Sequence, residues 1–135
     1  MTAAMTRDKA GAYVPVDMSF AGTKTADATA GVRTWTAQSM LGGLLVRTPG
    51  SAITDLPDTA ANIVAAMDNP QVGSSFFFVV VNLTASILTL GTSTGVTLAG
   101  TTAIAASAIR MYHAQVTAVG ATPAVVISGV GAMSA

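Results

Sequence analysis

The chain has 135 residues, which suits a single domain, and only 9% of them are charged, whereas a soluble domain normally carries roughly a quarter. The formal net charge is zero, so the sequence offers no electrostatic footprint for nucleic acid or for an anionic membrane. Cysteine is absent, which excludes disulfides and thiolate chemistry.

The few charges are distributed unevenly along the chain. Every acidic residue is an aspartate, none lies beyond Asp68, and Arg110 carries the only formal charge after that point. A surface so poor in charge does little to oppose association. We therefore predict that other protein covers much of this surface and that the chain is a component of an assembly.

Residues 1–33 are predicted to form an N-terminal arm, separate from a domain at residues 34–135. The arm mixes small, polar and charged residues without sustained periodicity, and Pro15 and several glycines interrupt any regular element. Two interpretations stay open: a disordered tail, or an extended arm that becomes ordered only against neighbouring molecules. In the second, Tyr13 and Phe20 are among its apolar anchors.

The domain is predicted to begin with a strand. After Trp35, the only tryptophan, an apolar run at residues 40–47 is typical of a strand with a glycine bulge at Gly42 and Gly43. Residues 48–51 supply a turn.

A single short helix is predicted at about residues 58–68. Asp58 or Thr59 can cap its first free amide groups, apolar side chains then recur at helical spacing, and Asn69-Pro70 ends it. A helix of about ten residues is marginal on its own, so we expect it to pack against a sheet.

Strands are predicted through the rest of the chain. The run from Ser74 to Val81 is apolar at both alternating sets of positions, so it should be a central strand with cover on each side. The most apolar window of the chain, residues 76–90, is interrupted by polar residues and falls short of the roughly 20 residues of a membrane helix. Short strands with glycine turns predict an all-β fold, an antiparallel sandwich or barrel. A β-solenoid is the alternative, because apolar residues near Leu90, Val96 and Ile104 recur at similar spacing. The further strands are predicted at 83–90, 96–98, 103–105, 109–117 and 124–128.

No catalytic, cofactor or metal site is predicted. His113 is the only histidine and has no carboxylate near it in sequence, so we interpret it as a structural or subunit-contact residue. Asp55 and Asp58 are three residues apart; acid–base work or calcium binding is possible for such a pair, but capping and turn formation are preferred.

Two arginines lie in strand-like segments, and both need partners if they are buried. Arg47 and Arg110 are interpreted as interface residues that pair with aspartates of an arm or of a neighbouring subunit, with solvated rim positions as the alternative. Asn82-Leu83-Thr84 matches the N-glycosylation pattern by accident, and the Asn82 side chain is predicted to close a turn. The candidate interface residues are Tyr13, Phe20, Trp35, Arg47, Arg110, Tyr112 and His113.

Five segments carry a likeness to a known group of proteins. They are WTAQSMLGGLLVR at 35–47, DTAANIVAA at 58–66, VGSSFFFVVVN at 72–82, GVTLAGT at 95–101, and RMY at 110–112 leading to 116–117. With them the chain from residue 34 onward resembles small virion proteins of tailed phages, of the head decoration (cement) and head-fibre type. The resemblance implies an all-β subunit, a homotrimer, that sits on the outer capsid surface and binds the major capsid protein. It carries over no active-site residue, and residues 1–33 have no counterpart in it.

Three functions are weighed on these grounds. Capsid decoration is preferred, with Trp35 and the arm expected to help in anchoring. A head-fibre or tail-fibre adhesin for a host glycan is the alternative, with Tyr13, Trp35 and Tyr112 as its candidate aromatics. An enzyme is the least favoured, because Cys and Glu are absent and His113 stands alone.

Overall fold

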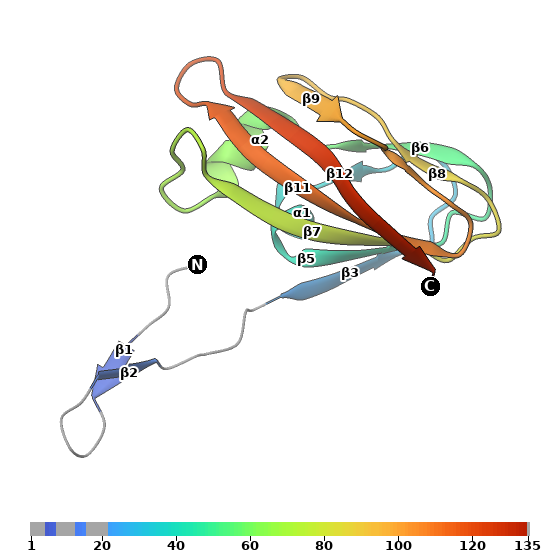
Figure 1. Ribbon diagram of the computed structural model, residues 1–135, viewed down its shortest axis with the longest axis horizontal. Coiled ribbons are helices and arrows are strands. Elements are labelled where there is room, and N and C mark those ends of the chain that lie inside the picture. Colours follow the sequence, from blue (N-terminus) through green and yellow to red (C-terminus); the bar gives the residue numbers. More distant parts are fainter. Residues whose placement is uncertain (1–4, 8–12, 16–21, 135) are drawn as a thin grey trace.

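The computed structural model describes residues 5–7, 13–15 and 22–134 (Figure 1). Strands predominate in this part of the chain, with two short helices among them, which confirms the predicted all-β class. No helix in the described ranges is long and apolar enough to span a membrane.

Most strands belong to one of two sheets, whose core-facing side chains meet in one cluster. The larger sheet has six strands in the order β3, β5, β7, β11, β12, β9. The smaller has four in the order β10, β8, β6, β4. The bounds in the larger sheet are β3 Thr23–Asp27, β5 Gly43–Arg47, β7 Ser75–Asn82, β11 Ala108–Ala118, β12 Ala124–Ser134 and β9 Val96–Ala99, and in the smaller β10 Ala103–Ile104, β8 Leu88–Leu90, β6 Ile53–Pro57 and β4 Thr34–Trp35. Separately, β1 (Met5–Arg7) pairs with β2 (Tyr13–Pro15).

The expectation of an antiparallel arrangement is wrong for about half of the strand pairs. Strands β3, β5 and β7 run parallel to one another, as do β4, β6 and β8, and β9 is parallel to β12. Parallel neighbours need crossover connections, and the helices supply part of them. Helix α1 (Ala37–Leu41) lies between β3 and β5 in the chain, and α2 (Ala60–Ala66) lies between β5 and β7. In the larger sheet the antiparallel pairs are β7 with β11 and β11 with β12.

The core lies between the inner faces of the two sheets and is centred on three aromatic side chains. Tyr112 stacks on Phe78 with ring centroids 5.2 Å apart, and Trp35 meets both of these rings edge-on at 6.3 and 6.2 Å. The Tyr112 hydroxyl donates to the carbonyl oxygen of Thr102 at 2.8 Å, and burial raises the pKa of this phenol. Trp35 lies on the smaller sheet and the other two on the larger, so this cluster joins the sheets.

The predicted helix is confirmed as α2. Thr59 is its N-cap, because its hydroxyl accepts from the Asn62 amide at 3.2 Å. The neighbouring Asp58 carboxylate contacts both helices: its Oδ2 accepts from the Ala37 amide at the start of α1, and its Oδ1 accepts from the Asn62 side chain of α2. Through this carboxylate the two helix N-termini are held together.

Helix α1 and strand β6 were not predicted. Residues 40–42 belong to α1 and its end instead of a strand, because the Thr36 hydroxyl caps a helical turn by accepting from the Ser39 amide. Gly43, at φ +93°, then makes the change of direction into β5 where a bulge was expected. Strand β6 was read as part of a turn, and it contains Asp55.

The boundary expected at residue 33 is wrong for residues 23–33. Strand β3 pairs in parallel with β5 and forms an edge of the larger sheet, and the chain after it lies against Arg47. The domain therefore includes the residues from Thr23 onward. Phe20 lies outside the described residues, and Tyr13 is placed only as part of the β2 backbone.

Gly129 of β12 tests this packing. A Cβ atom there would stand 1.9 Å from the Thr101 carbonyl oxygen, whereas one at Gly131 on the same strand would meet nothing within 4 Å. We expect Gly129→Ala to lower the free energy of unfolding by about 2–4 kcal/mol and Gly131→Ala by less than about 0.5 kcal/mol. Urea denaturation measures both, and equal effects would contradict the close approach of residues 101 and 129.

Candidate functional site

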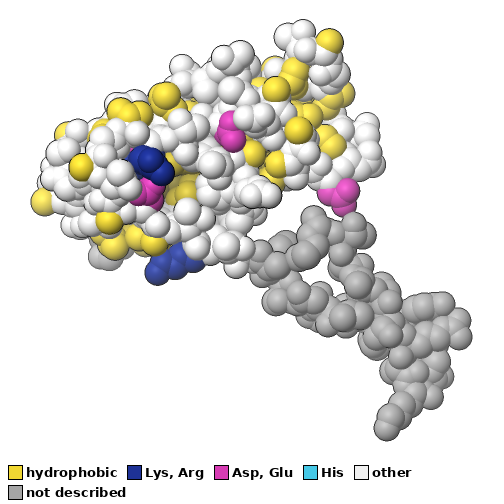
Figure 2. Space-filling model, turned by 180° about the vertical axis from the view of Figure 1, so that it is seen from behind, with side chains coloured by type: hydrophobic (Ala, Val, Ile, Leu, Met, Phe, Trp, Pro, Cys, Tyr) yellow, Lys and Arg dark blue, Asp and Glu magenta, His cyan; other side chains and the backbone are white. Residues whose placement is uncertain are grey.

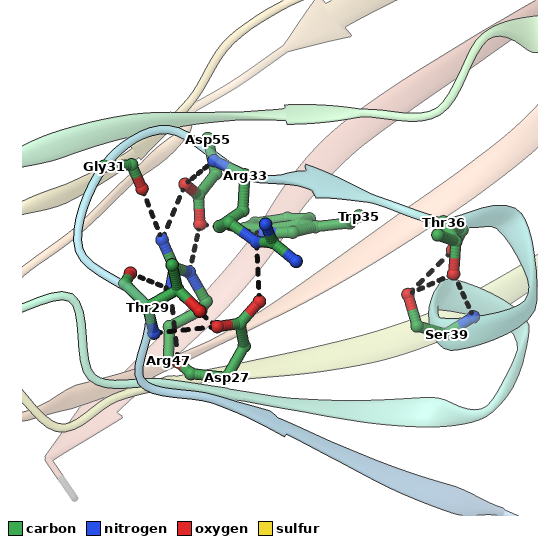
Figure 3. Close-up of polar contacts among 9 residues, drawn as sticks. All are labelled: Asp27, Thr29, Gly31, Arg33, Trp35, Thr36, Ser39, Arg47 and Asp55. Atoms are coloured by element: carbon green, nitrogen blue, oxygen red, sulfur yellow. Dashed lines mark hydrogen bonds and ion pairs between the residues drawn. The ribbon is translucent and has the colours of Figure 1, made fainter.

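A buried ion pair joins the two sheets. Arg47 of β5 and Asp55 of β6 are 1% and 0% exposed, and their contact has two parallel hydrogen bonds. The Arg47 Nε donates to Asp55 Oδ2 at 2.5 Å and Nη2 donates to Oδ1 at 3.0 Å (Figure 3). This fork-like geometry is the one in which guanidinium and carboxylate bind most strongly.

The remaining donors of Arg47 hold the connection between β3 and β4. Its Nη1 donates to the carbonyl oxygens of Asp27 and Thr29, and Nη2 donates to that of Gly31, all at 3.0–3.1 Å. These bonds, with the two to Asp55, use all five N–H donors of the guanidinium. The chain from 27 to 31 is thereby wrapped around one side chain.

The Asp55 carboxylate is satisfied in the same way. Beside the two bonds from Arg47, it accepts from the Trp35 indole N–H at 2.9 Å and from the Arg33 amide at 2.9 Å. Among the described residues, no buried side-chain polar atom lacks a hydrogen-bond partner. Because neither member of the pair has a free donor or acceptor, the geometry fits a structural link and leaves nothing to bind a ligand.

A small hollow adjoins this network. Its volume is about 110 Å³, and it is lined by residues that include Asp27, Arg33, Trp35 and Ser39. Ligand sites usually measure roughly 300–1,000 Å³, so this hollow holds a few waters and no sizeable substrate. Within the described ranges, no three His or Asp side chains lie close enough together to hold a metal ion.

Asp27 is a partly exposed member of the network. The hydrogen bonds that it accepts from Thr29, together with the bond and charge of Arg33, lower the pKa of its carboxyl from 3.8 to about 2. Its Oδ2 accepts from Arg33 Nε at 2.8 Å, and its Oδ1 lies 3.7 Å from Arg47 Nη1. Asp27 therefore links the edge strand β3 to both arginines.

The second feature is the face of the larger sheet that points away from the core, here called the outer face. On β7 the buried Phe78 and Val80 alternate with Phe77, Val79 and Val81, which point outward. Register extends this set to the neighbouring strands, since Val79 lies opposite Leu44 and Met111, and Phe77 lies opposite His113. Its apolar members are Ala26, Leu44, Val46, Phe77, Val79, Val81, Ile109, Met111, Val126 and Ala99.

Nothing in the described part of the chain covers the outer face. Phe77 is 57% and Met111 39% exposed, and the ring of Phe77 is in contact only with that of His113, at a centroid distance of 4.8 Å, among the aromatic pairs described. A sheet with one solvated face normally carries polar side chains there. The prediction that β7 is central is confirmed, but its expected cover is present on one side only.

The outer face is also nearly free of charge. Among its described residues Lys24, on the edge strand β3, is the only one with a formal charge; Arg110 lies on the other face, where its Nε donates to the Ala103 carbonyl oxygen. The opposite side of the molecule likewise shows only isolated charged side chains among polar and apolar ones (Figure 2).

The residues predicted as interface candidates separate into two groups. Trp35, Arg47 and Tyr112 are buried inside this chain, so their side chains offer no surface to another molecule. Trp35 and Tyr112 contact each other within the chain. Arg47 was expected to pair with aspartates of an arm or of a neighbouring subunit, and it pairs with Asp55 of this chain and with Asp27, which lies in the range predicted as the arm. His113 lies on the outer face and Arg110 at the margin of the core, both partly exposed.

Two further expectations about polar residues have different outcomes. Asn82 does close a turn, because its Nδ2 donates to the Ser86 carbonyl oxygen and its Oδ1 accepts from the Thr84 amide. It is fully buried. Asp55, by contrast, neither caps a helix nor forms a turn, and its pairing with Arg47 has no signal in the sequence beyond the need of a strand arginine for a partner.

Comparison with known proteins adds no assignment to these features. The chain matches no family model, no curated protein and no solved structure.

Replacing Arg47 tests the buried pair. We expect Arg47→Met to lower the free energy of unfolding by about 3–5 kcal/mol, because it leaves the Asp55 carboxylate buried without its counter-charge. The matched control is Arg33→Met, whose arginine is half-exposed in its ion pair with Asp27 and should contribute at most about 1 kcal/mol. Equal losses in thermal or urea unfolding would show that Arg47 is not the central link.

The carboxyl of Asp27 predicts a pH dependence. A pKa lowered from 3.8 to about 2 in the folded state contributes stability above pH 3.8 that is lost as the pH falls toward 2. The Asp27→Asn variant should therefore lose less stability than the wild type between pH 4 and 2. Unfolding curves across this range measure the difference, and parallel losses in the two proteins would contradict it.

Proposed function

We propose that this protein is a structural subunit of a phage virion, a decoration protein that binds the outer surface of the capsid as an oligomer and stabilises the shell. The observation that carries the proposal is the uncovered apolar outer face of the six-stranded sheet. A protein whose work is to be packed between other proteins needs such a face, whereas a protein that stays free in solution is poorly served by it.

Burial of apolar surface supplies the mechanism. Each contact that removes apolar surface from water contributes about 25 cal/mol per Å². A subunit that contacts neighbouring capsid proteins can bind only while the shell is intact. Its binding free energy therefore stabilises the intact shell relative to the ruptured one. The interior of the subunit is suited to such a load, because the Arg47–Asp55 pair and the aromatic cluster tie its two sheets together. We take this two-sheet packing to be a β-sandwich with mixed strand directions.

The adhesin alternative has weaker support. It relied on exposed aromatic side chains, and two of its three candidates, Trp35 and Tyr112, are buried. The hollow beside the Arg47–Asp55 pair is smaller than a typical glycan site.

Binding to capsids tests the proposal. The purified chain is mixed with capsids of the phage that encodes it, prepared without this gene, and the capsids are pelleted. We expect saturable binding at a fixed ratio to the capsid protein and a higher rupture temperature of the shell. Capsids that already carry their full complement are the control and should bind no more.

Occupancy distinguishes the two virion roles. Cryo-electron microscopy of the saturated particles should find the subunit over the whole shell, whereas a fibre would occupy isolated points. Failure to bind capsids under any assembly condition would contradict the decoration role.

A further inference from the structure

We infer that the outer face of the six-stranded sheet pairs with the same face of a second copy of this chain. The inference deepens the proposed function by naming the partner of this face. It rests on that proposal only in placing the paired copies on a capsid. It is argued from the composition, charge and size of the face.

The pattern of β7 shows that cover is needed. Its residues from Phe76 to Val81 are apolar on both faces, a composition typical of strands buried on both sides. Inside the chain Phe78 and Val80 are buried and Phe76 packs against the core, whereas Phe77, Val79 and Val81 point away from it. The neighbours of β7 repeat the pattern, because Leu44 and Val46 on one side and Ile109 and Met111 on the other point outward with Val79 and Val81.

Charge selects the partner. A face that binds nucleic acid, an anionic membrane or a charged protein needs formal charges of the opposite sign, and the centre of this face has none. The matching partner is another uncharged apolar sheet face. Every copy of the chain carries one, so a second copy meets the requirement without any further protein.

A two-fold symmetric pair keeps the two copies of Lys24, the charged residue of the outer face, apart. A two-fold axis parallel to β7 and β11, lying between the paired sheets, sets β3 of one copy across from β9 of its partner. Lys24 is in register with Val79, whereas Ala99 at the end of β9 is in register with Phe77, so Lys24 lies just beyond the partner's β9. The two Lys24 side chains are at opposite edges of the contact. No like charges meet in this arrangement.

The face is large enough for a specific contact. Its strands are 4 to 11 residues long. With strands about 4.8 Å apart and a rise of about 3.3 Å per residue, six of them present on the order of 700 Å². Specific interfaces bury about 800 Å² on each partner, and sheets commonly pack face to face at about 10 Å.

Solution mass and surface charge provide the first test. We expect the full chain to sediment as two copies at micromolar concentration. Met111→Lys and Phe77→Lys each place an ammonium on the outer face at side chains already exposed in the single chain, so the fold should persist by circular dichroism while the dissociation constant rises at least tenfold. Thr54→Lys, on the exposed side of β6, is the matched control and should leave the mass unchanged.

Cross-linking tests which faces meet, and the absence of cysteine makes single-cysteine variants clean probes. Val79→Cys and Met111→Cys lie on the central strands, so a short bis-maleimide linker should join two copies of the same variant. Thr54→Cys should give no dimer under the same conditions.

The outcomes separate this inference from the decoration role. A mass of one chain, a dimer unaffected by both lysine variants, or a trimer without same-site cross-links would overturn the pairing. Capsid binding by the wild-type chain in any of those cases would leave the decoration role standing. A face-to-face dimer that ignores capsids would support the pairing and contradict the decoration role.

Discussion

The fold depends on one buried ion pair. Arg47 comes from the larger sheet and Asp55 from the smaller, and the backbone carbonyls of the β3–β4 connection complete the guanidinium's hydrogen bonds. A buried pair of this kind is stabilising only when every donor and acceptor is matched, as here, because the desolvation of both charges must be offset. The pair therefore holds β5 of one sheet beside β6 of the other and orders the residues that lead from β3 to Trp35. Its complete internal satisfaction also explains why the most polar cluster of the described chain is no binding site.

The two faces of the larger sheet follow different rules. The inner face meets the smaller sheet and the helices, and its aromatic side chains, Asn82 and Tyr112 all have their partners within the chain. The outer face is built from residues of the same kinds and has no such partner in the described structure. The outer face thus has the apolar composition of a core-facing surface, without a second layer packed on it in the described structure. Low overall charge and this open face are two expressions of one property, a surface suited to contact with protein, and they lead to the same proposal of a subunit in an assembly.

The sequence predicted the elements whose local pattern is strong. Strand β7 has a long β-branched and aromatic run, and α2 has a capping threonine with apolar residues at helical spacing. The missed strands β3 and β6 are those whose stability comes from distant residues. Strand β6 contains Asp55 and Pro57, which are unusual in strands, and it forms because Asp55 reaches Arg47 and Trp35. Strand β3 is short and polar, so it reads as an arm until its pairing with β5 is known. Strand direction also depends on crossovers that no local pattern shows. Trp35 and Tyr112 were assigned to an interface because neither burial nor the acceptors of their polar atoms can be derived from sequence alone.

A density map of the assembled protein at side-chain resolution is the most direct test of the central claim, which is that the outer face of the six-stranded sheet is a protein contact. The account predicts continuous protein density packed against Phe77, Val79 and Met111, at the spacing of two packed sheets. A map in which these side chains face bulk solvent in every assembled copy would contradict it.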